Sequence, residues 1–195
     1  MSAVLYLHGF LSSPKSVKAQ QTHAFFQQHF PNVELVVPQL SNYPSKVAEQ
    51  LNTLLEEKPQ LLAGGLKVIG SSMGGFLSTW LVEKHGGKAV IVNPAVKPYE
   101  LLRGYLGEHV NPYSGESFTL VENDMTFLKA MDTPVLKAPE RYHVLLQTGD
   151  ETLDYRQAQT KYRESSLVIE MGGDHSFVDY DQHLPDIVAF LGVQG

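Results

Sequence analysis

Cysteine is absent from this chain of 195 residues. Its absence excludes disulfide bonds, thiolate metal sites and a cysteine nucleophile, and it suits a reducing compartment. Long apolar runs are absent as well, because no stretch approaches the roughly 20 apolar residues that cross a bilayer. The apolar run at the N-terminus is too short for a signal peptide and has no basic leader. We therefore expect a soluble, cytoplasmic protein with no membrane span.

An excess of basic residues is also lacking. Lys and Arg number 15 against 21 Asp and Glu, which gives a formal net charge of −6 and a pI near 5.7. No cluster of Lys or Arg could hold phosphates, so nucleic acid is not an expected partner. No repeat, low-complexity tract or linker divides the chain, and a hydrophobic content of 43% suffices for one core. We expect residues 1–195 to form a single domain, and the sequence predicts no particular oligomeric state.

Short apolar runs alternate with segments of helical period, a pattern typical of a parallel sheet covered on both faces. The expected strands lie at residues 4–7, 34–37, 66–69, 89–92, 144–146 and 167–169. The expected helices lie at residues 16–30, 44–58, 73–85, 155–162 and 184–191. The pattern predicts a three-layer α/β fold with a mostly parallel six-stranded sheet.

Residues 97–141 interrupt this alternation, because four prolines break up their short apolar stretches. We interpret the segment as an insertion. A long segment that follows a sheet strand is more often functional than idle, so a cap over a pocket is preferred to a plain surface excursion.

The run Gly70-Ser71-Ser72-Met73-Gly74 fits G-x-S-x-G, with an expected strand before it and an expected helix after it. Such a turn holds its middle serine in a strained conformation at the edge of the sheet. Ser72 is therefore the candidate nucleophile. Ser71 lacks glycines at both two-residue offsets, and no Lys follows Gly75 as a phosphate-binding loop would require. The plain alternative is a Gly/Ser turn without chemistry.

A serine hydroxyl needs a base to take its proton. His175 lies in the loop that follows the last expected strand, where catalytic groups collect. His183 lies near a helix start and is better explained as a capping or solvated residue. Of the eight histidines, His175 is the candidate base, and the others suit surface or packing positions.

The carboxylate that orients this base is expected after the strand at 144–146, where three acids occur. Asp150 comes first and is preferred, although its plain role would be that of a turn aspartate. Asp154 is the second choice and could instead be a helix N-cap. Glu151 ranks behind both.

An oxyanion needs two preset backbone N–H donors. Met73, directly after the candidate nucleophile, supplies one, and Phe10 in the loop after the first strand supplies the other. Gly9 permits a close approach there, and His8 is expected to bond the loop backbone. This chemistry requires no cofactor and no metal, and no H-E-x-x-H or similar ligand cluster occurs.

Several motifs together resemble one known family. They are residues 6–10, 70–75, 92–96, 111–115, 147–157 and 172–177. They closely resemble the YqiA-like esterases of the YcfP-like family, within the α/β-hydrolase superfamily, and the similarity runs nearly end to end. The resemblance implies a compact α/β hydrolase that lacks the first two strands of the full fold. It also implies action on short acyl esters and acyl-CoA thioesters, with Ser72, Asp150 and His175 as the triad.

Other functions suit the same residues. A dedicated acyl-CoA thioesterase or a peptidase would use the same triad, because the triad does not define its leaving group. A ligand-binding module could keep the pocket without turnover. The expected partner is a small-molecule acyl ester or thioester.

Overall fold

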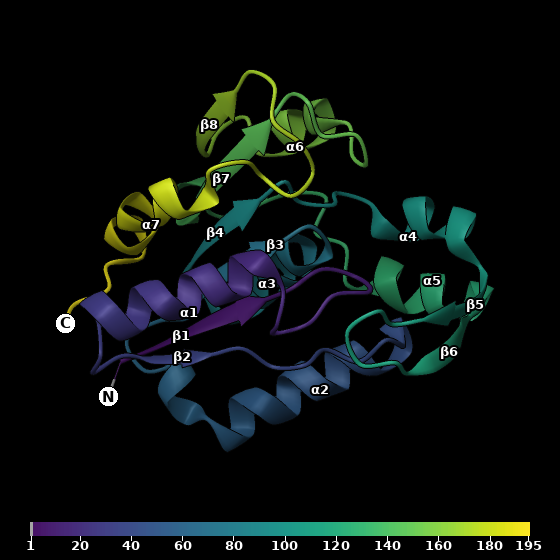
Figure 1. The fold of residues 1–195 in the computed structure, drawn as a ribbon, viewed down its shortest axis with the longest axis horizontal. Coiled ribbons are helices and arrows are strands. Elements are labelled where there is room, and N and C mark those ends of the chain that lie inside the picture. The colour runs from purple at the N-terminus through teal and green to yellow at the C-terminus, as the bar shows by residue number, and fades with distance from the viewer. Residues whose placement is uncertain (1) are drawn as a thin grey trace.

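A computed structural model describes residues 2–195, and a six-stranded sheet forms its centre (Figure 1). The strand order is β2-β1-β3-β4-β7-β8, and every neighbouring pair is parallel. The strands are β1 (Ala3–Leu7), β2 (Glu34–Val36), β3 (Lys67–Ser71), β4 (Lys88–Val92), β7 (Tyr142–Gln147) and β8 (Ser166–Glu170). The predicted parallel sheet is confirmed, and each predicted strand matches within about two residues.

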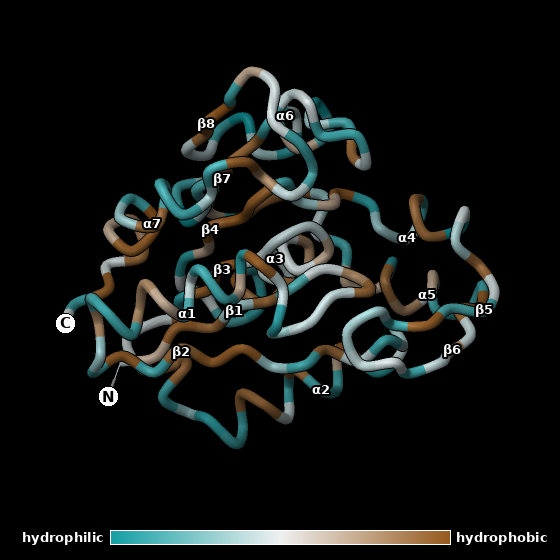
Figure 2. The backbone as a smooth tube through the Cα atoms, in the orientation of Figure 1, coloured by the Kyte–Doolittle hydropathy of each residue, from teal (hydrophilic) through white to brown (hydrophobic). Residues whose placement is uncertain are grey.

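Helices cover both faces of this sheet. They are α1 (Val17–His29), α2 (Pro44–Glu57), α3 (Met73–His85), α6 (Tyr155–Lys161) and α7 (Leu184–Leu191). Alternate strand residues point to opposite faces, so β1 contributes Leu5 to the core under α2 and α3, and Val4 and Tyr6 to the core under α1 and α7. Figure 2 shows the apolar strands running through the middle of the molecule. The three-layer α/β fold follows from these two cores.

Local signals explain the helix ends. Pro44 occupies the first turn of α2, where its missing N–H is not needed. Val47, Leu51 and Leu55 then bury one face of that helix. Gly86 ends α3 with φ 77°, a conformation that favours glycine.

The chain between β4 and β7 forms a substructure of its own at one end of the sheet (Figure 1). It contains α4 (Pro98–Leu101), η2 (Leu102–Tyr105), β5 (Gly107–Val110), β6 (Ser117–Leu120), α5 (Glu122–Ala130) and η3 (Pro139–Arg141). Strands β5 and β6 pair as an antiparallel hairpin, which the sequence analysis did not anticipate. Two further 3₁₀ turns, η1 (Pro59–Leu61) and η4 (Tyr180–His183), lie elsewhere.

One buried asparagine ties this hairpin to the rest of the molecule. Asn111 is fully buried, and its side-chain amide donates to the Asn42 side-chain oxygen at 2.8 Å and to the Ser12 carbonyl at 3.3 Å. Its own side-chain oxygen accepts the N–H of Tyr113 at 2.9 Å. The Asn111 side chain therefore links three segments that are far apart in the sequence.

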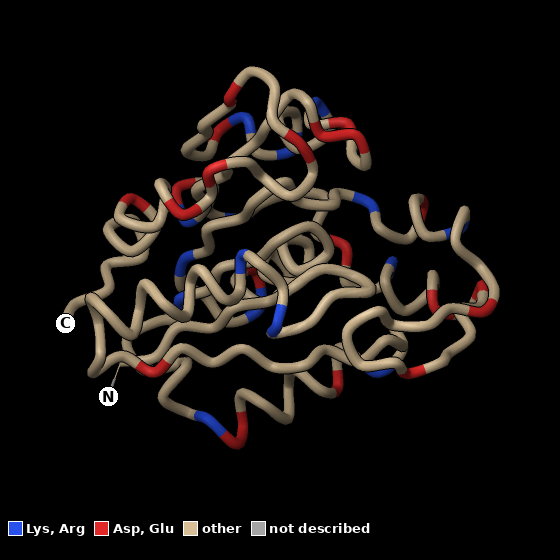
Figure 3. Tube along the Cα trace, in the orientation of Figure 1, with Lys and Arg blue, Asp and Glu red and all other residues tan. Residues whose placement is uncertain are grey.

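Charged residues lie mainly on helices and loops, and no strand of the central sheet carries more than one (Figure 3). Lys67 and Lys88, at the amino ends of β3 and β4, donate to the carbonyls of Gly192 and Phe190 at the end of α7, each at 3.1 Å. Cations there complement the negative end of the helix. Over residues 2–195, no helix has both the length and the apolar character that a membrane span requires.

Candidate active site

Ser72 lies at the sharp turn between β3 and α3. Its backbone has φ 56° and ψ −120°, a conformation that is strained for a residue with a side chain. The flanking glycines leave room for this turn. A Cβ on Gly70 would collide with the Gly74 carbonyl, and a Cβ on Gly74 would collide with the Leu7 carbonyl. The turn thus presents the Ser72 hydroxyl at the carboxyl edge of the sheet.

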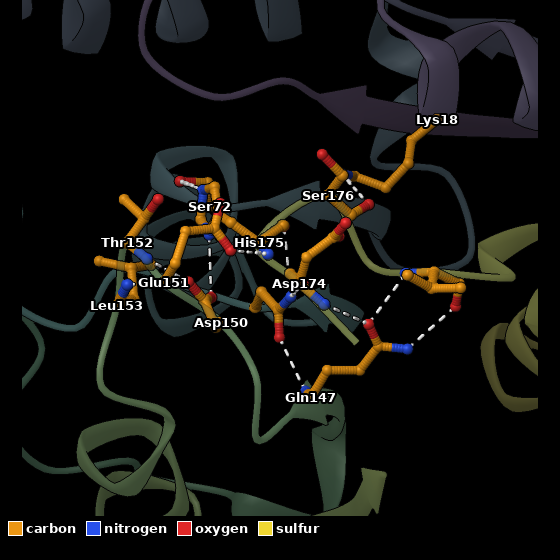
Figure 4. A network of polar contacts seen from close by, with 12 residues as sticks. Lys18, Ser72, Gln147, Asp150, Glu151, Thr152, Leu153, Asp174, His175 and Ser176 are labelled. Atoms are coloured by element: carbon orange, nitrogen blue, oxygen red, sulfur yellow. Dashed lines mark hydrogen bonds and ion pairs between the residues drawn. The ribbon is translucent and has the colours of Figure 1, made fainter. Parts of the chain in front are cut away.

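The structure brings the side chains of Ser72, His175 and Asp150 together in one line (Figure 4). His175 Nε2 lies 3.1 Å from Ser72 Oγ, and His175 Nδ1 lies 2.9 Å from Asp150 Oδ2. Only 1% of the Asp150 side chain is exposed, against 23% for His175. When Nδ1–H donates to the carboxylate, Nε2 is left to accept the serine proton.

The acidic residues near this line have different contacts. Asp150 Oδ1 accepts the N–H groups of Thr152 and Leu153 at 2.9 and 2.8 Å, which fixes the carboxylate that faces His175. Glu151 accepts the backbone N–H of His175 at 2.9 Å, and this hydrogen bond lowers the pKa of Glu151.

Asp154 is the N-cap of α6 and does not reach His175. It accepts the backbone N–H of Arg156 at 3.0 Å, and the Arg156 guanidinium binds both of its oxygens. That guanidinium lowers the pKa of Asp154. The contacts match the capping role that the sequence left open for this residue.

Two buried amide side chains hold the loop that carries His175, and the sequence analysis missed both. The Asn93 side chain donates to the carbonyls of Asp174 and His175 at 3.0 and 3.2 Å, and accepts the N–H of Gln147 at 3.0 Å. Gln147 Oε1 in turn accepts the N–H groups of Asp174 and Val178 at 3.2 and 2.9 Å. The available signal was that each of these two residues directly follows a predicted apolar run, at 89–92 and 144–146.

The sequence predicts that the backbone N–H groups of Phe10 and Met73 bind the oxyanion. The loop after β1 passes close to the nucleophile, because a Cβ on Gly9 would lie 3.3 Å from Ser72 Cβ. Met73 begins α3, where N–H groups have no partner within the helix. Within residues 2–195, neither N–H donates to another backbone group outside regular elements. Both residues line a cavity that borders Ser72 and His175.

His8 supports the loop that carries Phe10, as the sequence analysis expected. Its Nε2 accepts the N–H of Leu40 at 3.1 Å, so the proton lies on Nδ1, which donates to the Gly9 carbonyl at 2.9 Å. Burial lowers the pKa of His8. The neutral ring is therefore a structural link between the loops after β1 and β2.

His183 lies at the start of α7, where its ring nitrogen Nε2 is 3.0 Å from a Glu170 oxygen. It is not in contact with Ser72. Among residues 2–195, no three His, Asp or Glu side chains gather as metal ligands would.

Two cavities of different character meet at Ser72 and His175. The first is about 210 Å³ and mostly apolar, and its wall includes Leu11, Pro98, Leu101, Leu102 and Tyr105. The second is about 160 Å³, and about half of its wall is polar, with Ser12, Ser16, Lys18 and Ser176 among the lining residues; we call it the polar cavity. The candidate nucleophile thus lies between a mostly apolar cavity and a more polar one.

Three solved structures that are similar to this chain are hydrolases or esterases by name. A candidate hydrolase from Agrobacterium vitis matches with a TM-score of 0.71 and 18% identity, covering 97% of this chain and 88% of that chain. Est1E from Butyrivibrio proteoclasticus, solved with ferulic acid, matches with a TM-score of 0.68 and 12% identity over 97% and 88% of the two chains. The esterase domain of a Rhodothermus marinus protein matches with a TM-score of 0.68 and 15% identity over 98% and 85%. These matches show that the fold is that of the α/β hydrolases.

The sequence itself matches one family profile over nearly its whole length. The profile is described as uncharacterised protein family UPF0227, and it matches residues 3–192. This match confirms the resemblance drawn from the motifs. The chain belongs to UPF0227, the YqiA and YcfP esterase family of α/β hydrolases.

Proposed function

We propose that the chain is a serine hydrolase that cleaves short acyl esters through an acyl-enzyme on Ser72. One observation carries the proposal: the hydrogen-bonded line from Ser72 Oγ through His175 to Asp150, on a strained turn after β3. A serine hydroxyl in an ordinary turn needs neither a strained backbone nor an imidazole held by a buried carboxylate.

Each side chain has a role in this mechanism. Ser72 attacks the ester carbonyl while His175 Nε2 takes its proton. The N–H groups of Phe10 and Met73 bind the oxyanion of the tetrahedral intermediate. The protonated His175 then gives its proton to the departing alcohol, and Asp150 stabilises the imidazolium and keeps its orientation. Water, activated by the same imidazole, releases the acid and restores Ser72.

The apolar cavity supports a short acyl chain. At about 210 Å³ it is smaller than the roughly 300–1,000 Å³ of pockets that hold drug-sized ligands. Residues Pro98, Leu101 and Leu102 of its wall come from the segment between β4 and β7. We therefore assign residues 97–141 as a cap within a single domain of residues 1–195.

The test is hydrolysis of p-nitrophenyl butyrate by the wild type and by Ser72→Ala. We expect turnover to fall by about 10⁴- to 10⁶-fold in the variant, as it does when a triad loses its nucleophile. Ser117, which is exposed on β6, provides the matched Ser→Ala control. Near-normal hydrolysis by Ser72→Ala would falsify the assignment.

Two further measurements define the chemistry. A fluorophosphonate probe should label the wild type and the Ser117→Ala variant but not Ser72→Ala, and a butyryl adduct on the peptide that contains Ser72 would identify the acyl-enzyme. Butyryl-CoA and an amide of the same acyl group, assayed beside the ester, separate an esterase from a thioesterase or a peptidase.

A further inference from the structure

The polar cavity beside Ser72 contains one cationic side chain, that of Lys18. This residue lies in the first turn of α1 and is only partly exposed, and its side chain forms part of the cavity wall together with Ser12, Ser16 and Ser176. The cavity also borders Ser72 and His175. A cation and several hydroxyl groups therefore lie beside the atoms that would react.

The Lys18 ammonium has spare hydrogen-bonding capacity. Its Nζ donates to the Ser176 carbonyl at 2.7 Å, which uses one of three N–H groups (Figure 4). Within residues 2–195, no carboxylate lies within 4 Å of this nitrogen. Burial lowers the pKa of Lys18, while the charges of Asp174 and Asp150 favour its protonated form. The cation thus faces the cavity without a paired anion.

The two cavities suit different parts of an ester substrate. A hydrocarbon acyl chain gains most from the apolar cavity, since the transfer of apolar surface out of water is its main source of binding energy. With the acyl chain there and the carbonyl carbon at Ser72 Oγ, the alcohol portion faces the polar cavity. Lys18 is also hydrogen-bonded to Ser176, the residue that follows His175. In the proposed mechanism, His175 protonates the departing alcohol.

We propose that Lys18 binds an anionic oxygen group, such as a carboxylate, on the alcohol portion of the substrate. This inference rests on the proposed esterase function and defines its substrate class. A hydrogen bond between an ammonium and a carboxylate in a partly buried site contributes enough to favour the charged substrate by about tenfold or more.

A matched pair of esters tests the charge alone. One is 5-(butyryloxy)-2-nitrobenzoate, which carries a carboxylate on the alcohol portion, and the other is its carboxamide, which has nearly the same shape without the charge. We expect the wild type to show a kcat/KM about tenfold higher for the carboxylate. We expect Lys18→Met to bring the ratio close to one and Lys18→Arg to keep most of it. Lys15→Met, at an exposed lysine outside the cavity wall, should keep the wild-type ratio.

The ratio of the two kcat/KM values distinguishes recognition of the carboxylate by Lys18 from a general disturbance of the active site. Lys18 could instead serve only to hold the His175 loop through Ser176, or to offset the buried charge of Asp174, whose Oδ1 has no hydrogen-bond partner within residues 2–195. In that case Lys18→Met would slow both esters equally and the ratio would stay as in the wild type, which would overturn the proposal. A wild type without preference for the carboxylate would overturn it as well.

A binding measurement separates this proposal from the proposed function. Ser72→Ala protein is titrated with 5-hydroxy-2-nitrobenzoate and with its carboxamide, and the titrations are repeated with Ser72→Ala/Lys18→Met. Tighter binding of the carboxylate that is lost with Lys18 supports the anion site even if no ester is hydrolysed. Equal binding of the two compounds to Ser72→Ala contradicts the site even if the esterase activity is present.

Discussion

The side-chain amide of Asn93 donates to the carbonyl oxygen of His175 at 3.2 Å, so the end of β4 holds the loop that follows β8. The same amide donates to the Asp174 carbonyl at 3.0 Å. Asn93 is 1% exposed, and its backbone has φ 40°. A strained, buried polar residue thus holds the backbone that carries the imidazole.

Replacement of Asn93 should therefore affect turnover more than substrate binding. We expect Asn93→Ala to lower kcat about 10²-fold with little change in KM, because a displacement of about 1 Å in a reacting group has an effect of this size. Asn93→Gly is the matched control, since glycine tolerates the positive φ but also lacks the amide. Recovery of kcat in Asn93→Gly would show that backbone strain, and not the lost hydrogen bonds, caused the defect.

The strained backbone of Ser72 predicts that a glycine at this position gives a more stable protein than an alanine. A non-glycine residue at such a φ costs roughly 1–3 kcal/mol, and glycine relieves that strain while it loses more entropy on folding. We expect Ser72→Gly to raise the free energy of unfolding by about 1 kcal/mol relative to Ser72→Ala, while both lack hydrolysis. Urea denaturation of the two variants measures the difference, and a less stable glycine variant would contradict the strain argument.

The two aspartates that follow β7 should behave differently when each is changed to asparagine. Asp150→Asn should lower kcat by about 10⁴-fold, because an asparagine no longer favours the correct histidine tautomer. Asp154→Asn should have a far smaller effect on turnover, because asparagine also caps helices well. Steady-state kinetics of the two variants checks this order, and the larger loss in Asp154→Asn would reverse the assignment.

His8 predicts a loss of stability in mild acid. Burial holds its pKa in the folded protein below the ordinary value of 6.5. The unfolded chain then binds more protons as the pH falls below 6.5, so the stabilising contribution is complete above that pH and is lost as the pH approaches the lowered pKa. The free energy of unfolding should fall over this range.

His8→Gln isolates this contribution, because glutamine can accept the Leu40 N–H and does not titrate. Urea denaturation at several pH values should give a flatter dependence for the variant. Burial also lowers the pKa values of His85 and His143, but these residues are present in both proteins. The same slope in both proteins would show that His8 does not contribute.

The sequence was sufficient to predict most of the fold and the residues that meet at Ser72. Buried parallel strands are continuous apolar runs, and the groups that follow them must lie along one edge. The G-x-S-x-G motif therefore indicated Ser72, and the order of elements indicated the loops that contain Asp150 and His175. The hairpin of β5 and β6 was missed because four-residue strands with one exposed face carry too little apolar signal.

Other features depend on packing that a single sequence does not specify. Asn93 meets the loop of His175 because β4 and β8 lie on either side of β7 in the sheet, although the two residues are 82 positions apart in the chain. Lys18 lines the cavity because α1 packs on the sheet with one particular rotation about its axis. The weak amphipathic pattern of α1 gives no sign of that rotation.

Asn111 links the hairpin to the loops that contain Ser12 and Asn42. Separation of the hairpin from those loops would leave several buried polar groups without partners at once, so the three segments should open as one cooperative unit rather than one by one. We therefore expect the wall of the apolar cavity to change shape mainly through α4 and η2, which contribute no residue to this link. Amide hydrogen exchange would detect such a unit as a shared rate across all three segments.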